Sequence, residues 1–197
     1  GKVIVATNEE EIPRLNNLFE RGQQNGLQGL KELSAEEVKE IEPYVNGVKG
    51  IKVPETGIID YKVVSEKLAE IIRKKGVEIK FNERLENIKE NISLNKNEII
   101  TNKEIYTCNL LISCCGLQSD RIAKLNNKNL NIKIIPFRGE YYTIKKEKRH
   151  LVKNLIYPVP DPQFPFLGVH FTRMINGKVE AGPNAVFAFK REGYKKT

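Results

Sequence analysis

The sequence predicts a mixed α+β fold, which combines part of an α/β domain with a region of antiparallel β structure. Three observations support this prediction. After Ile132 the chain alternates short apolar runs with turn residues, while its middle combines an amphipathic helix with an apolar run that does not alternate. The 197 residues are 40% hydrophobic and 29% charged. This composition excludes disordered, collagen-like and coiled-coil chains.

Two helices and two strands are predicted in the first 55 residues. Residues 2–6 form an apolar strand, and Asn8 with Glu11 is the capping pair of a helix whose apolar residues have helical spacing. A second capping pair, Ser34 and Glu37, begins a short helix that ends at a proline. A short strand follows at 50–53.

The middle of the chain follows a different pattern. Asp60 caps a predicted helix that runs to about Lys75. The run 110–115 is apolar without alternation, which is typical of a strand buried on both faces of a parallel sheet. These elements indicate part of an α/β domain, although the sequence contains no G-x-G-x-x-G. Between the helix and that run, strands are predicted at 77–81, 85–89, 92–94, 98–101 and 105–107.

The remainder of the chain is predicted to be antiparallel β structure. Asn176-Gly177 is a strong hairpin signal between the last two strands. The four predicted strands are 138–144, 155–159, 167–173 and 178–181.

Charge and cysteine content exclude several kinds of site. The net charge is +8, but 24 of the 33 basic residues are lysines scattered between apolar positions, so no basic stripe for nucleic acid is formed. The three cysteines include the adjacent Cys114 and Cys115, and no Cys or His spacing suits zinc, so no metal site is predicted. Unpaired cysteines of this kind fit a reducing compartment, and we expect a cytoplasmic location.

Candidate chemistry gathers in residues 136–194, where rigid, aromatic and charged residues crowd together. Strand alternation places Val169, Phe171 and Arg173 on one face and His170 with Thr172 on the other. One interpretation is a packed sheet with an ion-paired arginine. The other is a site for a small acid, because arginine holds carboxylates and histidine moves protons near neutral pH.

These runs resemble the L-2-hydroxyglutarate oxidases and dehydrogenases, which are FAD enzymes of the D-amino-acid-oxidase-like group. The shorter matching segments are Val5-Ala6-Thr7, Arg21-Gly22, Asn25-Gly26, Leu33-Ser34-Ala35, Glu42-Pro43, Val53-Pro54, residues 56–61, Cys115-Gly116-Leu117 and Ser119-Asp120-Arg121. The longer and more specific ones are 136–142, 155–162, 165–173, 182–185 and 191–194.

The resemblance implies a substrate domain, built on the antiparallel sheet, that is interleaved with a Rossmann-like FAD-binding domain. On this mapping, residues 1–55 and 132–197 belong to the substrate domain and 56–131 to the FAD-binding domain. Because the glycine-rich motif that holds the FAD pyrophosphate is missing, we expect the chain to be a central segment of a longer protein. We also expect it to bind little or no FAD by itself and to be inactive alone.

Roles for individual residues also follow from the resemblance. His170 is the candidate base that accepts the hydroxyl proton. Arg138 and Arg173 are candidates for the two substrate carboxylates, and Tyr141 and Tyr157 for hydroxyl donors or walls beside the flavin. Core packing is the alternative for each tyrosine. The candidate contacts to FAD are Leu85, Cys115 and Gly116.

The implied reaction converts a small dicarboxylic hydroxy acid, L-2-hydroxyglutarate, to 2-oxoglutarate. Electrons would pass through FAD to oxygen or to a membrane quinone, the latter from a peripheral position on the inner membrane. Two alternatives remain open on the sequence. One is a flavoprotein similar to glycerol-3-phosphate dehydrogenase, and the other is a non-catalytic binding module cut from a larger protein.

Overall fold

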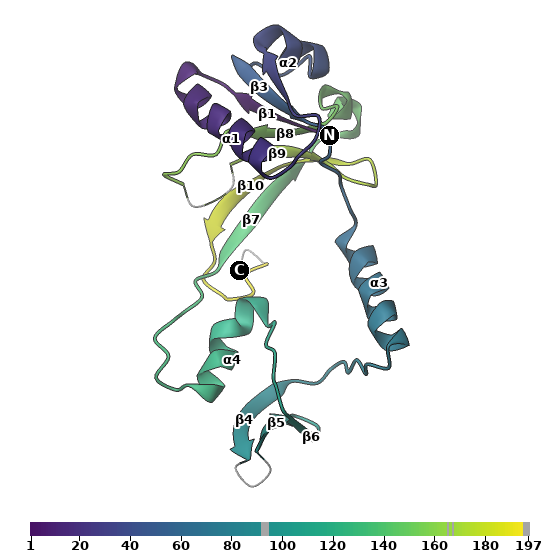
Figure 1. Ribbon diagram of the computed structural model, residues 1–197, viewed down its shortest axis with the longest axis vertical. Helices are drawn as coiled ribbons and strands as arrows, with labels where there is room; N and C mark the ends of the chain where they lie inside the picture. The colour runs from purple at the N-terminus through teal and green to yellow at the C-terminus, as the bar shows by residue number, and fades with distance from the viewer. Residues whose placement is uncertain (92–94, 165, 167, 195–197) are drawn as a thin grey trace. The chain divides into compact units, whose positions relative to one another are not determined.

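The computed structural model describes residues 1–91, 95–164, 166 and 168–194. The chain forms two compact units. Unit 1 contains Gly1–Val64 and Arg138–Val186, and unit 2 contains Ser65–Phe137 with the residues from Phe187 on. The prediction of a mixed α+β fold is confirmed, because each unit combines helical segments with a sheet (Figure 1).

Unit 1 is built on a seven-stranded sheet with the strand order β2-β3-β1-β8-β9-β10-β7. Strands β1 and β8 pair in parallel, with Ile4 opposite Tyr157, whereas β2–β3, β3–β1, β8–β9 and β9–β10 are antiparallel. The strands are β1 (Lys2–Ala6), β2 (Lys31–Ser34), β3 (Lys49–Val53), β7 (Phe137–Thr143), β8 (Leu155–Pro158), β9 (His170–Arg173) and β10 (Val179–Phe187).

Two helices cover opposite faces of this sheet. Alternate residues of β1 point to opposite sides. Val3 packs in one core group with Val38 of α2 (Ala35–Ile41). Ala6 packs in a second group with Leu15 of α1 (Ile12–Gln24). The core of unit 1 therefore has two layers, one on each face of β1.

The two predicted capping pairs form, although Glu11 bonds to Thr7 rather than to Asn8. The Asn8 side chain accepts a hydrogen bond from the Glu11 N–H at 3.2 Å and begins a 3-10 turn, η1 (Glu9–Glu11), that leads into α1. The Glu11 carboxylate accepts from the Thr7 N–H at 2.7 Å instead of from Asn8. Ser34 and Glu37 form the complete reciprocal box at the start of α2. The capping residues thus fix both helix starts.

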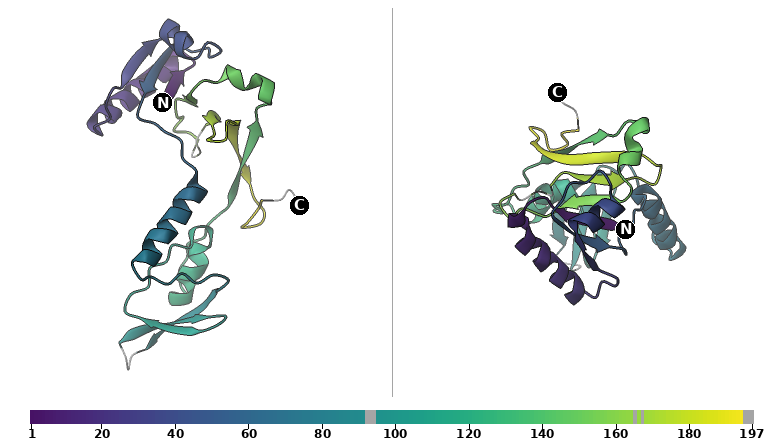
Figure 2. Two further views of the ribbon diagram at one scale, coloured as in Figure 1. Left: turned by 90° about the vertical axis from the view of Figure 1, so that its right-hand side faces the viewer. Right: turned by 90° about the horizontal axis from the view of Figure 1, so that it is seen from above.

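Unit 2 has a smaller antiparallel sheet of order β4-β5-β6. Helix α3 (Tyr61–Lys74) enters this unit from unit 1, after Asp60 has capped it by accepting the Lys62 N–H at 2.9 Å. Helix α4 (Ser119–Asn126) packs beside β4 (Figure 2). The other elements are β4 (Leu85–Asn91), β5 (Lys96–Thr101), β6 (Ile105–Cys108) and the 3-10 turn η2 (Gly116–Gln118). The strand expected at 92–94 lies outside the described residues.

Two predicted strands do not form. Residues 77–81 and 110–115 have no strand pairing in the described chain, and Leu110 and Ile112 are 74% and 75% exposed. The prediction that 110–115 is a buried parallel strand is therefore wrong for this structure. A strand must pair its N–H and C=O groups with a neighbour. None of the described residues provides a parallel neighbour here, so the apolar run stays unpaired.

Each compact unit is formed from two separate segments of the chain, so the units alternate along the sequence. Residues 187–194 lie in unit 2, whereas the sequence places them with the substrate domain. The assignment of 1–55, 56–131 and 132–197 to substrate-binding and FAD-binding domains stays a prediction. In the ranges that the structure describes, no helix is long and apolar enough to cross a membrane.

Candidate active site

His170 is a buried histidine at the start of β9. Its side chain is 6% exposed, and Nδ1 lies 2.9 Å from the Gly168 carbonyl oxygen. A carbonyl can only accept, so Nδ1 carries the proton in this bond and Nε2 of the neutral ring keeps its lone pair. His170 is therefore held in the tautomer that a proton acceptor requires.

An aromatic ring adjoins this imidazole, and an ammonium group lies near that aromatic ring. The ring of Tyr157 on β8 stacks on His170 with 4.2 Å between centroids and 17° between planes. The Lys2 Nζ lies 5.0 Å from the centroid of the same tyrosine ring. Burial lowers the pKa of Lys2. Sequence reasoning missed Lys2, because a single lysine in an apolar strand normally extends to solvent.

A cavity of about 560 Å³ lies within unit 1 beside this stack. Its wall includes Tyr157 and Arg173 from the sheet, together with Asp60 and Lys62 from the start of α3. This volume is within the range of small-molecule sites. The cavity thus brings together two of the predicted substrate residues, and Tyr157 links its wall to His170.

The two predicted arginines have different surroundings. Arg173 Nη1 donates to the Val152 carbonyl oxygen at 2.5 Å, and Arg173 lines the cavity. Arg138 Nη2 donates to the Glu140 carboxylate at 2.7 Å, and Arg138 is not in the cavity wall. The structure therefore places Arg173 with Tyr157 and leaves Arg138 paired with a neighbouring acid.

Tyr141 on β7 is 50% exposed and adjoins Gly182 of β10 rather than the cavity. Gly182 lies opposite His170 in the β9–β10 register and has φ +157°. A Cβ at this position would lie 2.6 Å from the Tyr141 ring and 2.8 Å from the Glu140 carbonyl oxygen.

We expect Gly182→Ala to destabilise the chain by about 2 kcal/mol, because the added methyl group overlaps ring and backbone atoms in a conformation that favours glycine. Thermal and urea unfolding followed by circular dichroism measure this loss. Gly57→Ala is the matched control, because no atom lies within 4 Å of its added Cβ. Equal midpoints for the two variants would contradict the close approach at Gly182.

The residues proposed to contact FAD lie in unit 2. Leu85 starts β4 opposite Thr101, and the exposed Cys115 precedes Gly116 at the start of η2. Gly116 has φ +48°, and no atom lies within 4 Å of the place where its Cβ would be.

A buried ion pair holds the segment that follows Gly116. The Arg191 guanidinium donates to both Asp120 carboxylate oxygens and to the Leu117 carbonyl oxygen, the last at 2.7 Å. Asp120 also accepts the Ile134 N–H at 3.0 Å. The hydrogen bond from Arg191 is the main reason that the pKa of Asp120 lies well below its usual range, and the bond from Ile134 is the second.

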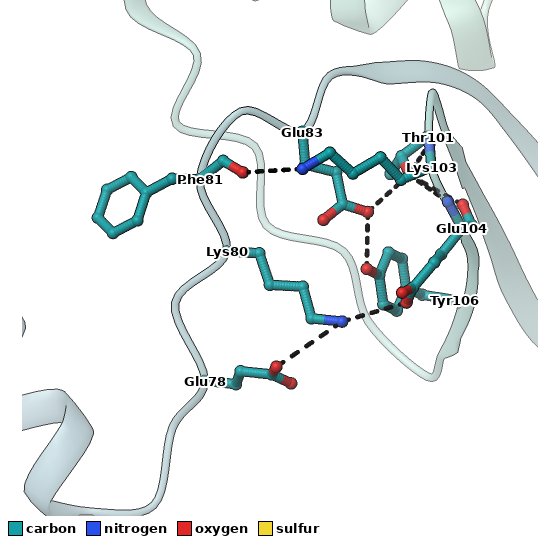
Figure 3. Close-up of polar contacts among 8 residues, drawn as sticks. All are labelled: Glu78, Lys80, Phe81, Glu83, Thr101, Lys103, Glu104 and Tyr106. Carbon is teal, nitrogen blue, oxygen red and sulfur yellow. Dashed lines mark hydrogen bonds and ion pairs between the residues drawn. The ribbon is translucent and has the colours of Figure 1, made fainter.

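A second polar cluster holds the segment before β4 (Figure 3). The Glu83 carboxylate accepts hydrogen bonds from the hydroxyls of Tyr106 at 2.6 Å and Thr101 at 2.7 Å, and these two bonds lower the pKa of Glu83. Lys80 Nζ lies 4.6 Å from the centroid of the Tyr106 ring and 3.1 Å from the Glu104 carboxylate. These side-chain contacts attach the unpaired segment to the β5–β6 hairpin.

Metal-ligating side chains are not gathered anywhere in the described part of the chain. No group of three or more His, Cys, Asp or Glu side chains that could hold a metal ion is found there. Cys108, Cys114 and Cys115 are free thiols, and the latter two are exposed rather than buried as the sequence suggested.

The comparison with known families gives a match over nearly the whole chain. Residues 1–196 match the family described as FAD dependent oxidoreductase. This chain belongs to the FAD dependent oxidoreductase family.

Two relatives in the family carry the same name. The L-2-hydroxyglutarate dehydrogenase of Indibacter alkaliphilus is 58% identical over 198 residues, which cover 100% of this chain and 49% of that protein. The mitochondrial L-2-hydroxyglutarate dehydrogenase of Homo sapiens is 45% identical over 208 residues, which cover 99% of this chain and 44% of that protein. The chain thus spans about half the length of these relatives.

Solved structures support the family fold. Dithionite-reduced L-alpha-glycerophosphate oxidase from Mycoplasma pneumoniae with FAD bound has a TM-score of 0.84 and 28% identity, covering 100% of this chain and 52% of that one. Glycine oxidase from Bacillus cereus has a TM-score of 0.74 and 21% identity, covering 96% of this chain and 50% of that one. The second likeness shows the fold alone.

Unit 2 has an open backbone position at Gly116. The positive φ and the open space at Gly116 allow a bound group to approach the main chain closely, which a side chain would prevent. Leu85 and Cys115 are the other two candidate contacts to FAD. Their contact with FAD stays a prediction.

Proposed function

We propose that this chain is part of a flavoenzyme that oxidises the 2-hydroxyl group of L-2-hydroxyglutarate to the 2-oxo group of 2-oxoglutarate. The proposal is supported by 58% and 45% identity to two proteins named L-2-hydroxyglutarate dehydrogenase. Because the chain spans about half of each, the proposed activity belongs to the full-length flavoprotein that contains it.

The reaction removes a hydride and a proton from the substrate. When bound, FAD supplies the acceptor for the hydride that leaves C2. The hydroxyl proton must leave as well, and a base that takes it increases the tendency of C2 to release hydride. We assign this base to Nε2 of His170, and the carbonyl group of the product forms as the O–H and C–H bonds break.

The observation that carries this assignment is the bond from His170 Nδ1 to the Gly168 carbonyl oxygen at 2.9 Å. Of the two neutral tautomers, it favours the one with a lone pair on Nε2, which is the atom that must receive the proton. The stacked ring of Tyr157 further limits rotation of the imidazole. The sheet therefore supplies an oriented base.

Arg173 is the proposed partner of one substrate carboxylate. It lines the cavity with Lys62, while Asp60, the acid in the same wall, accepts the N–H of Lys62 at the start of α3. A guanidinium binds a carboxylate through two parallel hydrogen bonds, which also fixes the orientation of the acid. Tyr157, in the same wall, would donate its hydroxyl to the substrate or lie against the flavin.

Arg138 and Tyr141 remain candidates for the second carboxylate and for a hydroxyl donor. Arg138 is paired with Glu140, so a substrate carboxylate would compete with an existing ion pair. Oxygen or a membrane quinone is the proposed final electron acceptor, and the cytoplasm, with the surface of the inner membrane as the alternative, is the proposed location.

The likeness to L-alpha-glycerophosphate oxidase favours glycerol 3-phosphate as the second candidate substrate. In the full-length flavoprotein we expect L-2-hydroxyglutarate to exceed glycerol 3-phosphate by about 100-fold or more in kcat/KM, because a site built for a carboxylate rejects a substrate that leaves its polar groups unpaired. Anaerobic reduction of the flavin by each substrate measures this ratio.

L-Lactate is the control, since it has the 2-hydroxy acid group but only one carboxylate. We expect its KM to be well above that of L-2-hydroxyglutarate. Faster reduction by glycerol 3-phosphate than by L-2-hydroxyglutarate would establish the second candidate and exclude the first.

A further inference from the structure

Glu42 is a fully buried carboxylate that the proposed chemistry does not use. It follows the last residue of α2, is 0% exposed, and its N–H donates to the Val38 carbonyl oxygen at 2.8 Å. Its side chain accepts three hydrogen bonds, and all three come from two residues that follow it by more than a hundred positions. These are the Lys153 N–H at 3.0 Å, the Asn154 N–H at 2.5 Å and the Asn154 side-chain amide at 2.8 Å.

One of these donors belongs to the peptide group that also binds Arg173. The Lys153 N–H and the Val152 C=O are the two ends of a single peptide bond. Glu42 Oε2 accepts at the N–H end, and Arg173 Nη1 donates to the C=O end at 2.5 Å. The carboxylate and the guanidinium are thus joined through one peptide group.

The physical effect of this arrangement is to strengthen the hold on Arg173. A carboxylate at the N–H end polarises the peptide and makes its carbonyl oxygen a better acceptor, and hydrogen bonds in such a chain reinforce one another in a buried setting. Val152 is itself buried in the core, so the peptide has little freedom to rotate. Within the described chain, the Arg173 side chain makes one hydrogen bond, which is the bond to Val152.

We propose that Glu42 is a positioning residue, which fixes the Arg173 guanidinium for a substrate carboxylate through the Val152–Lys153 peptide group. This inference rests on the proposed function, because it takes Arg173 as the carboxylate anchor. Glu42 is not among the residues that line the cavity. Its role is to fix the position of the Arg173 guanidinium.

The test is a double-mutant cycle in the full-length flavoprotein, with L-2-hydroxyglutarate as substrate. Arg173→Met removes the anchor, and we expect KM to rise about 100-fold. Glu42→Gln keeps the shape of the side chain but turns one acceptor into a donor that faces a backbone N–H. We expect KM to rise about 5- to 10-fold while kcat changes less than about twofold, as for a loss of uniform binding.

The decisive measurement is the double variant. If Glu42 acts through Arg173, Glu42→Gln adds no further increase in KM when Arg173 is already methionine, because the two residues form one unit. Glu40→Gln is the matched control, being the same substitution at an exposed position of the same helix. It should leave KM and the thermal midpoint unchanged.

Asn154→Ala removes only the side-chain donor to Glu42 and tests the same coupling if Glu42→Gln does not fold. We expect it to raise KM about twofold, and only while Arg173 is present. An equal effect of Glu42→Gln or Asn154→Ala with and without Arg173, or a lower thermal midpoint with unchanged KM, would overturn the role of Glu42 alone. An unchanged KM for Arg173→Met would overturn the anchor and the inference together.

Discussion

Replacing His170 with glutamine in the full-length flavoprotein is expected to slow flavin reduction by L-2-hydroxyglutarate about 10²- to 10⁴-fold, the range that a positioned proton acceptor contributes. Glutamine can still donate to the Gly168 carbonyl oxygen, so the local structure keeps its hydrogen bond. It cannot accept a proton at neutral pH. The rate of anaerobic flavin reduction, measured at saturating substrate by stopped-flow absorbance, reports this step directly.

The other histidine of the chain provides the control. His150 Nδ1 also contacts a carbonyl oxygen at 2.9 Å, that of Glu147, but the ring lies in an exposed 3-10 turn, η3 (Lys146–Leu151), against Tyr44. His150→Gln should leave flavin reduction unchanged. Flavin content is measured for both variants, so that lost cofactor is not mistaken for lost catalysis. If the flavin of the His170→Gln variant is reduced by L-2-hydroxyglutarate at the native rate, His170 has no part in the mechanism.

Local signals predicted the helix starts and one hairpin. Asn8, Ser34 and Asp60 cap helical segments as expected, because a short polar side chain satisfies backbone N–H groups that the helix leaves open. Asn176-Gly177 forms the turn between β9 and β10, with Gly177 at φ +75°. Each of these features depends on residues within a few positions of one another.

The alternating segment 77–81 and the apolar run 110–115 are predicted as strands, and neither forms one in the described chain. An apolar run records that a segment is suited to burial, but strand formation needs a partner that the run itself does not specify. The same limit applies to β1, whose parallel pairing with β8 joins residues about 150 positions apart in the sequence. The local residue pattern indicates which segment can form a strand, whereas distant parts of the chain determine which strand it pairs with.

The site residues also differ in whether their local sequence indicates their role. The residue types of His170, Tyr157 and Arg173 suggested their chemistry, and the structure places Tyr157 against His170 and in the wall of the cavity that includes Arg173. The sequence suggested no role at the site for Lys2 or Glu42. Each is tied to the other site residues through contacts between distant parts of the chain, which no spacing in the sequence reveals.

The ion pair between Asp120 and Arg191 is expected to dominate the stability of unit 2. Asp120→Asn leaves the guanidinium of Arg191 without its counter-charge in a largely buried position, so we expect the thermal midpoint at pH 7 to fall by about 10 °C. Asp161→Asn is the control. Its partner Arg14 lies 3.5 Å away in a partly exposed pair, which should contribute less than about 2 °C.

The loss should depend on pH in a defined direction. The folded state holds the pKa of Asp120 well below the ordinary value of 3.8, chiefly through Arg191, so the unfolded chain binds a proton more readily. The carboxylate therefore contributes its full stability above about pH 4 and loses it as the pH falls further. The difference in midpoint between the native chain and Asp120→Asn should be constant from pH 7 to pH 5 and narrow towards pH 2.5. A difference that stays the same down to pH 2.5 would show that shape and hydrogen bonding, rather than the charge of Asp120, hold Arg191 in place.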